Sequence, residues 1–129
     1  LGNDYIYDEY STAVYGIMMN TEKSIFKSDK LRYALLFASD KSSLSLPFGY
    51  SAADGIVAPS VKNSFGSYRD TAGSRTTVKP DEVKAYSSYQ SACENIDKAD
   101  LHSVNILAVQ NRDEEIGESL SGILQQWRA

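Results

Sequence analysis

The strongest helix-start signal in the chain lies within Lys79-Pro80-Asp81-Glu82-Val83-Lys84-Ala85-Tyr86-Ser87-Ser88-Tyr89-Gln90-Ser91-Ala92-Cys93-Glu94-Asn95-Ile96. Proline lacks the N–H that a first helical turn leaves unpaired, and the two carboxylates behind it face the positive end of the helix dipole. These features predict a helix over residues 80–97. Its apolar positions recur at three- and four-residue steps, which is typical of a face packed against the rest of the protein: Val83, Tyr86, Tyr89 or Gln90, Cys93 and Ile96.

Other segments share this helical spacing and have residues suited to cap a helix start, namely Asp4, Ser28 or Asp29, Asp100 and Asn111. They predict helices over residues 4–19, 29–39, 100–109 and 112–128. The expected fold is therefore all-α, a bundle-like domain of four to five helices arranged around residues 80–97. Branched and aromatic residues leave two alternatives open, which are an extended N-terminus and an α+β fold with short strands at about 31–38 and 103–109.

The last predicted helix has its apolar residues on one side, with glycine at two positions inside it. Each glycine weakens a helix by about 1 kcal/mol relative to alanine. Gly117 and Gly122 therefore indicate either close packing against a neighbour or easy fraying. The apolar face consists of Ile116, Leu120, Ile123, Leu124 and Trp127.

Residues 40–78 form a long irregular insertion, with eight serines, four glycines and two prolines. An unstructured loop of this length is uncommon in a compact domain, so we expect a turn or two of helix near residues 51–57 or 60–66. Pro47 and Pro59 should interrupt regular structure on either side. Short apolar islands are expected to fold back onto the core: Leu44 with Leu46, Ile56 with Val57, Val61, Phe65 and Tyr68.

The chain of 129 residues, 42% hydrophobic and 23% charged, has the size and composition of a single soluble globular domain. Its longest apolar run, residues 33–38, is far too short to span a membrane. A single cysteine, Cys93, excludes an intrachain disulfide and leaves the compartment open. Because the chain opens at Leu1 without a methionine, we expect a processed mature chain or an excised domain.

Charge is unevenly distributed along the chain, which has a net charge of −4. Residues 62–79 carry four bases against one acid, whereas residues 81–118 carry nine acids against three bases. The overall acidity argues against nucleic acid as a partner. The basic segment contains Arg69 and Arg75, whose guanidinium groups could act as fingers toward a carboxylate or phosphate of a partner. The alternative is that they keep the serine-rich loop soluble and pair with the acidic helices of the same chain.

Residue types needed for catalysis or for a cofactor are scarce. His102 is the only histidine, and its nine-residue offset from Cys93 would place the two on opposite faces of a continuous helix. Two histidine or cysteine residues in total are too few for a structural zinc site. Neither a Gly-Lys-Ser/Thr ending nor a Gly-x-Gly-x-x-Gly motif is present to hold phosphates. We expect no catalytic residue, metal or cofactor, and the balance favours a role other than catalysis.

Tyrosine is abundant, with nine in the chain. Its rigid ring and polar tip are over-represented in protein interfaces, so a cluster including Tyr5, Tyr7, Tyr10 and Tyr15 is a candidate docking face, with core packing as the equal alternative. Phe65 and Tyr68 add aromatic rings to the basic loop. The favoured hypothesis is a non-catalytic protein-binding module: an inhibitor, immunity protein, adaptor or regulatory domain. The alternatives are a small enzyme or enzyme-regulating domain that uses the loop arginines, and a self-associating coat or filament subunit.

Overall fold

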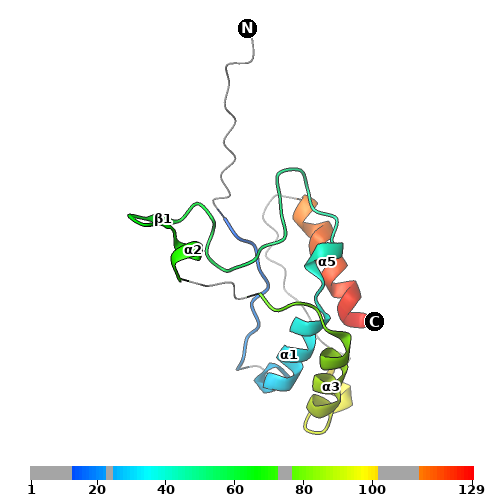
Figure 1. The fold of residues 1–129 in the computed structure, drawn as a ribbon. Helices are drawn as coiled ribbons and strands as arrows, with labels where there is room; N and C mark the ends of the chain where they lie inside the picture. Colours follow the sequence, from blue (N-terminus) through cyan, green and yellow to red (C-terminus); the bar gives the residue numbers. More distant parts are fainter. Residues whose placement is uncertain (1–12, 23–24, 73–76, 102–113) are drawn as a thin grey trace. The chain divides into compact units, whose positions relative to one another are not determined.

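The computed structural model describes residues 13–22, 25–72, 77–101 and 114–129, which are mostly helical with one short two-stranded hairpin (Figure 1). These residues divide into two compact units. The hairpin unit contains residues 13–17 and the described part of Ala53–Thr77, and the helical unit contains the described parts of Met18–Ala52 and Val78–Ala129. Each unit has its own candidate surface for function.

Helix α1 spans Asp29–Ala38 and follows the 3₁₀ turn η1 (Ile25–Lys27). The Ser28 hydroxyl caps its start by accepting a hydrogen bond from the backbone N–H of Leu31 at 3.3 Å. Leu31 and Ala34 are buried, as the predicted apolar face requires. The helix predicted at 29–39 is therefore confirmed, and the alternative strand at 31–38 is wrong.

Helix α3 spans Glu82–Cys93, so the helix predicted at 80–97 exists but is shorter at both ends. The Asp81 carboxylate is its N-cap, accepting from the backbone N–H of Lys84 at 3.0 Å, and Pro80 stands one residue outside the cap. The backbone N–H of Asp81 also donates to the Phe37 carbonyl at 2.9 Å, which ties the start of α3 to the end of α1. A turn at Glu94 and Asn95 ends the helix.

The buried side of α3 differs from the predicted stripe. Ala92 is 1% exposed, and Ala85 and Ser88 are half-buried, whereas Val83 is 79% exposed and Tyr86 63% exposed. Small side chains at these positions let α1 and α3 approach closely, so the large apolar side chains turn outward. The prediction that Val83 and Tyr86 are core residues is wrong, and Cys93 and Ile96 are half-buried.

Helix α5 spans Glu114–Arg128, which confirms the helix predicted at 112–128. Ile123 is buried, and the other members of its predicted apolar face are half-buried. Trp127 attaches this helix to α1, because its indole Nε1 donates to the Leu35 carbonyl at 3.1 Å and to the Ser39 hydroxyl at 2.8 Å. Close packing, one of the two explanations for the glycines, holds at Gly122, where an added Cβ would lie 2.9 Å from Leu44 Cδ2.

A small core lies in the helical unit. Ile25, Leu31 and Ala92 are its buried members, and Phe26, Ile96 and Leu101 pack against them. Leu101 ends the short helix α4 (Lys98–Leu101), which follows α3 after a turn. Cys93 is a free thiol, and no helix within the described ranges is long and apolar enough to cross a membrane.

Several predicted elements differ from the structure. Residues 13–19 are not helical, and residues 4–12 lie outside the described part. Helix α4 begins at Lys98 rather than after a cap at Asp100. Residues 102–109, which include the alternative strand at 103–109, and the predicted cap Asn111 lie outside the described ranges. No helix occupies 51–57 or 60–66, where serine and glycine favour turns. The insertion instead contains η2 (Lys41–Ser43), β1 (Lys62–Asn63), β2 (Gly66–Ser67) and α2 (Tyr68–Ala72).

Candidate functional site

The hairpin unit presents its side chains from a tight antiparallel turn. Strands β1 and β2 pair with Lys62 opposite Ser67 and Asn63 opposite Gly66, so that two residues form the turn. The Asn63 side-chain oxygen accepts from the backbone N–H of Phe65 at 2.8 Å, and Gly66 has a φ of +127°, a conformation that other residues rarely adopt. Phe65 is thereby fixed at the tip of the hairpin.

The strand pairing continues one step beyond the hairpin. The backbone N–H of Tyr68 donates to the Val61 carbonyl at 2.9 Å, which places these two residues opposite each other in the same register. Residues directly opposite in an antiparallel pair project to the same face. The Val61 and Tyr68 side chains therefore share one face of the hairpin.

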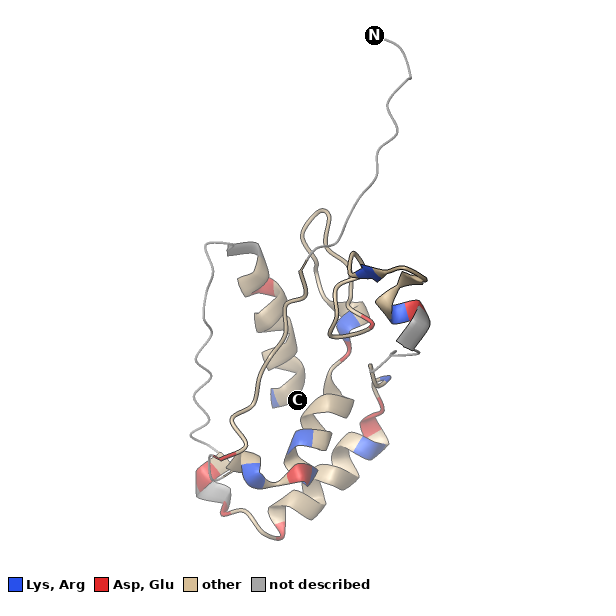
Figure 2. Cartoon of the chain, turned by 90° about the vertical axis from the view of Figure 1, so that its left-hand side faces the viewer, with Lys and Arg blue, Asp and Glu red and all other residues tan. Residues whose placement is uncertain are grey.

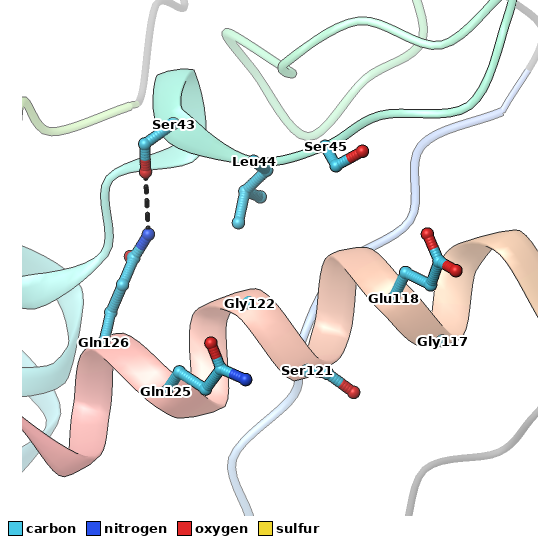
Figure 3. Close-up of a pocket in the computed structure, with 9 residues that line it drawn as sticks. All are labelled: Ser43, Leu44, Ser45, Gly117, Glu118, Ser121, Gly122, Gln125 and Gln126. Atoms are coloured by element: carbon cyan, nitrogen blue, oxygen red, sulfur yellow. Dashed lines mark hydrogen bonds between the residues drawn. The ribbon is translucent and has the colours of Figure 1, made fainter.

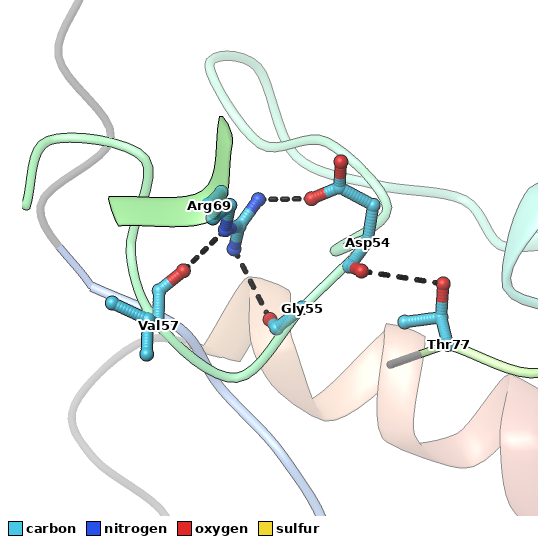
Figure 4. A network of polar contacts seen from close by, with 5 residues as sticks. All are labelled: Asp54, Gly55, Val57, Arg69 and Thr77. Atoms are coloured by element: carbon cyan, nitrogen blue, oxygen red, sulfur yellow. Dashed lines mark hydrogen bonds and ion pairs between the residues drawn. The ribbon is translucent and has the colours of Figure 1, made fainter. Parts of the chain in front are cut away.

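Arg69, the second residue of α2, fastens the preceding loop to the hairpin (Figure 4). Its Nε donates to the Val57 carbonyl, one terminal nitrogen donates to the Asp54 carboxylate, and the other donates to the Gly55 carbonyl at 3.1 Å. The Arg69 side chain is only 12% exposed. A planar guanidinium with several N–H groups suits this fork of acceptors, so Arg69 acts as a clamp on residues 54–57.

Around this clamp the unit exposes large apolar side chains. Phe65 is 87% exposed at the hairpin tip, and Ile56, held between two carbonyls that bind Arg69, is 82% exposed. Val61 and Tyr68 are exposed as well. We call these four residues the hairpin patch. Their exposure contradicts the expectation that the apolar islands at Ile56, Val61, Phe65 and Tyr68 fold back onto the core.

Three of the residues singled out in the sequence lie in the hairpin unit, with Phe65 at the hairpin tip and Tyr68 and Arg69 at the start of α2. Arg69 directs its donors to two carbonyls and to the Asp54 carboxylate of its own unit, and Asp54 lies in a loop rather than in one of the acidic helices expected as partners. Arg75, Tyr5, Tyr7 and Tyr10 lie outside the described residues. Sequence reasoning missed Ile56 and Val61 as surface residues, although the glycines and prolines around them indicated a loop.

A second candidate is a groove in the helical unit, between residues 43–45 and one side of α5 (Figure 3). It encloses about 660 Å³ and is open to solvent. Gln126 holds the groove together, because its side-chain amide accepts from the backbone N–H of Asp40 at 2.8 Å and donates to the Ser43 hydroxyl at 2.9 Å. The Ser119 hydroxyl donates to the Ser45 carbonyl at 2.9 Å. Hydroxyl and amide groups dominate the lining, with Glu118 as its one charge.

The outward side of α3 is a third candidate. Val83, Tyr86 and Tyr89 are exposed there at helical spacing, and Cys93 continues the row as a half-buried residue. A hydrogen bond with the Cys93 thiol, together with electrostatic repulsion and partial burial, raises the pKa of Tyr89 above its ordinary value. We call Val83, Tyr86, Tyr89 and Cys93 the α3 outer face.

The charged side chains of the described residues are distributed over several elements. Figure 2 shows acidic and basic residues spread over the described helices, with most of α5 free of charge between Glu118 and Arg128. Among the described residues, no group of three or more histidine, cysteine or acidic side chains is placed to hold a metal ion. Hydrogen bonds from Ser42 to Asp40, and from Lys84 to Asp81, lower the pKa of each carboxyl because both residues cap turns or helices. His102 lies outside the described part.

Comparison with known proteins gives no relative: no protein-family model, curated protein or solved structure matches this chain.

Proposed function

We propose that this chain is a non-catalytic protein-binding module that contacts its partner through the hairpin patch. The observation that carries the proposal is the 87% exposure of Phe65 on a turn whose backbone is fixed by Asn63 and Gly66. An inhibitor, an immunity protein, an adaptor or a regulatory domain would each use such a surface. Residues of the hairpin patch take the role of anchors in a partner's pocket.

The energetics favour this use of the patch. Burying a side chain such as phenylalanine or isoleucine removes apolar surface from water and is worth about 1.5–3 kcal/mol. Association costs less when the binding loop is already ordered. The Arg69 clamp orders residues 54–57 before any partner arrives, so Ile56 starts from a fixed backbone. Aromatic anchors commonly dominate the energy of protein interfaces.

A second part of the proposal concerns how the chain folds. We infer that α1, α3 and α5 belong to one bundle-like arrangement and that the whole chain folds as a single domain. The hydrogen bonds of Trp127 to α1 and of Asp81 to Phe37 support the bundle, because they join α5 and the start of α3 to the same helix.

The test compares the full chain with two phenylalanine variants as bait in extracts of the cells that produce it. Phe65→Ser removes the hairpin anchor, and Phe48→Ser is the matched control, since Phe48 is fully exposed in the helical unit. We expect a partner protein that wild type and Phe48→Ser retain equally and that Phe65→Ser retains at least about tenfold less, as one lost anchor implies. Equal retention by all three proteins would contradict the proposal.

Self-association remains the second proposal, and exposed apolar side chains on both units favour it. In that case the partner retained by the patch is another copy of the chain. Sedimentation of wild type at increasing concentration distinguishes the two, because a hetero-binding module stays monomeric. A catalytic or enzyme-regulating role for the loop arginines is tested by replacing Arg69 and Arg75 with alanine, which should abolish activity outright in that case and only weaken partner affinity in a binding module.

A further inference from the structure

Helix α3 has two different faces, and within the described ranges one of them packs against α1 while the other is largely exposed. Ala85, Ser88 and Ala92 recur at steps of three and four residues and form the side turned toward α1. Val83, Tyr86, Tyr89 and Cys93 recur at the same kind of step on a different side of the helix. The spacing of this second set is typical of a face that packs against another element.

The exposed apolar side chains of the α3 outer face lie next to one another along the helix. Val83 is 79% exposed and Tyr86 is 63% exposed, and they stand three residues apart on the same helix. Isolated exposed apolar residues are normal on protein surfaces, but a row at helical spacing marks an interaction site. The row is also on a rigid element, since Asp81 caps the helix and is bonded to the Phe37 carbonyl.

The charges of α3 indicate the chemistry of the occupant. Glu82 stands beside the first turn of the outer face, Glu94 follows its last residue, and both are exposed. The one lysine of α3, Lys84, is directed to the other side, where its Nζ lies 3.2 Å from the Asp81 carboxylate and 5.5 Å from the centre of the Phe37 ring. The outer face is therefore an apolar row with acids at both ends.

We propose that the α3 outer face docks an amphipathic helix of another protein, one whose apolar side is flanked by lysine or arginine. Helix-on-helix packing matches residues at steps of three and four on both partners. Basic flanks complement Glu82 and Glu94, whereas a second copy of the same face would set acid against acid. This surface goes beyond the hairpin patch, and its test uses different residues.

The probe is a synthetic amphipathic peptide of about 18 residues, long enough to form a helix when docked, with leucine on one side and lysine on the flanks. A matched peptide carries glutamate in place of lysine. Binding to the full chain is measured by calorimetry and, independently, by the rate at which a maleimide labels Cys93. Because Cys93 is the only cysteine and ends the outer face, an occupant should protect it.

We expect the lysine peptide to bind and to slow the labelling of Cys93, and the glutamate peptide to bind at least tenfold more weakly. The double variant Val83→Ser with Tyr86→Ser should weaken binding of the lysine peptide at least tenfold. Phe48→Ser is the control that should leave this affinity unchanged, since Phe48 is fully exposed outside α3. Both altered residues are exposed, so circular dichroism should show the helical content of wild type.

Three outcomes overturn the proposal. Equal affinity of the double variant and wild type would place the peptide elsewhere on the chain. Equal affinity for both peptides would show that Glu82 and Glu94 do not select a partner with basic flanks. Dimerisation of wild type that the double variant abolishes would make a second copy the occupant. Loss of partner retention in Phe65→Ser, by contrast, bears on the hairpin patch alone.

Discussion

Arg69 illustrates how one side chain organises a loop. We predict that Arg69→Lys opens residues 54–57, because one ammonium group cannot reach the Asp54 carboxylate and the two carbonyls that the guanidinium bridges. The loss of hydrogen bonds to a charged group should lower the local opening free energy by about 1.5–3 kcal/mol. Hydrogen exchange of the backbone amides at residues 54–57 measures this change.

Asp54→Asn is the matched control for this prediction. The Asp54 side chain is 54% exposed, and exposed ion pairs contribute less than about 1 kcal/mol. The asparagine oxygen can still accept from Arg69, so protection should fall much less than in Arg69→Lys. If the two variants lose protection equally, the ion pair rather than the pair of carbonyls holds the loop.

The stability of the first turn of α3 depends on pH through the Asp81 carboxyl, which caps the helix. The hydrogen bond from the Lys84 N–H lowers the pKa of the Asp81 carboxyl, so its stabilising effect is complete above the ordinary aspartate pKa of about 3.9. The effect is lost as the pH falls through the lowered pKa. We expect the first turn of α3 to fray below about pH 4, as followed by the amide signals of residues 82–84. Asp81→Asn keeps an N-cap and removes the charge, so its first turn should not respond to pH in this range.

At the level of elements, α5 meets residues 43–45 at Gly122, where an added Cβ would have to displace the end of the Leu44 side chain. Gly122→Ala should gain less than the roughly 1 kcal/mol that alanine normally adds to a helix, because the new Cβ would meet Leu44 Cδ2 at 2.9 Å. In a Leu44→Ala background the obstruction is gone, and the same change should stabilise the protein by about 1 kcal/mol. Urea unfolding of the four proteins in this cycle measures the coupling. An identical effect of Gly122→Ala in both backgrounds would show that Leu44 does not limit the position.

The helices that could be predicted are those in which a capping residue or a clear row of apolar residues marks the helix and its buried side. A cap at Ser28 or Asp29 with Leu31 and Ala34 favoured the helix α1 over a strand at 31–38, and the apolar face ending at Trp127 predicted α5. For α3 the start was recognisable, but the buried side was not. The sequence period reveals a row of large apolar residues. Which side of α3 is buried depends instead on how closely α1 packs against it, and the small side chain of Ala92 allows close packing.

The candidate site could be predicted only in part, for a related reason. The aromatic and basic character of residues 65–69 was visible in the sequence, so Phe65, Tyr68 and Arg69 were identified. The sequence did not reveal which groups the Arg69 side chain would bind. Its acceptors belong to residues 54–57, and a contact with them depends on the path of the loop. The groove beside α5 was missed entirely, since Ser43 and Gln126 are far apart in sequence and carry no motif.

For the whole molecule, the two compact units raise the question of cooperativity. The proposal of a single domain predicts that both lose structure in one transition. Trp127, the only tryptophan, reports on the helical unit through its fluorescence, and amide exchange at residues 54–57 reports on the hairpin unit. We expect the two probes to give the same midpoint in urea. Separate midpoints would show that the units fold independently.

The position of the Arg69 guanidinium also determines how the chain responds to proteases. Trypsin must take a basic side chain into its own specificity pocket, and Arg69 is enclosed by the acceptors of its own loop, whereas Lys27 is exposed just before α1 and is followed by Ser28. Cleavage after Arg69 therefore requires the loop to open first, and the order in which tryptic fragments appear becomes a record of how often that opening occurs.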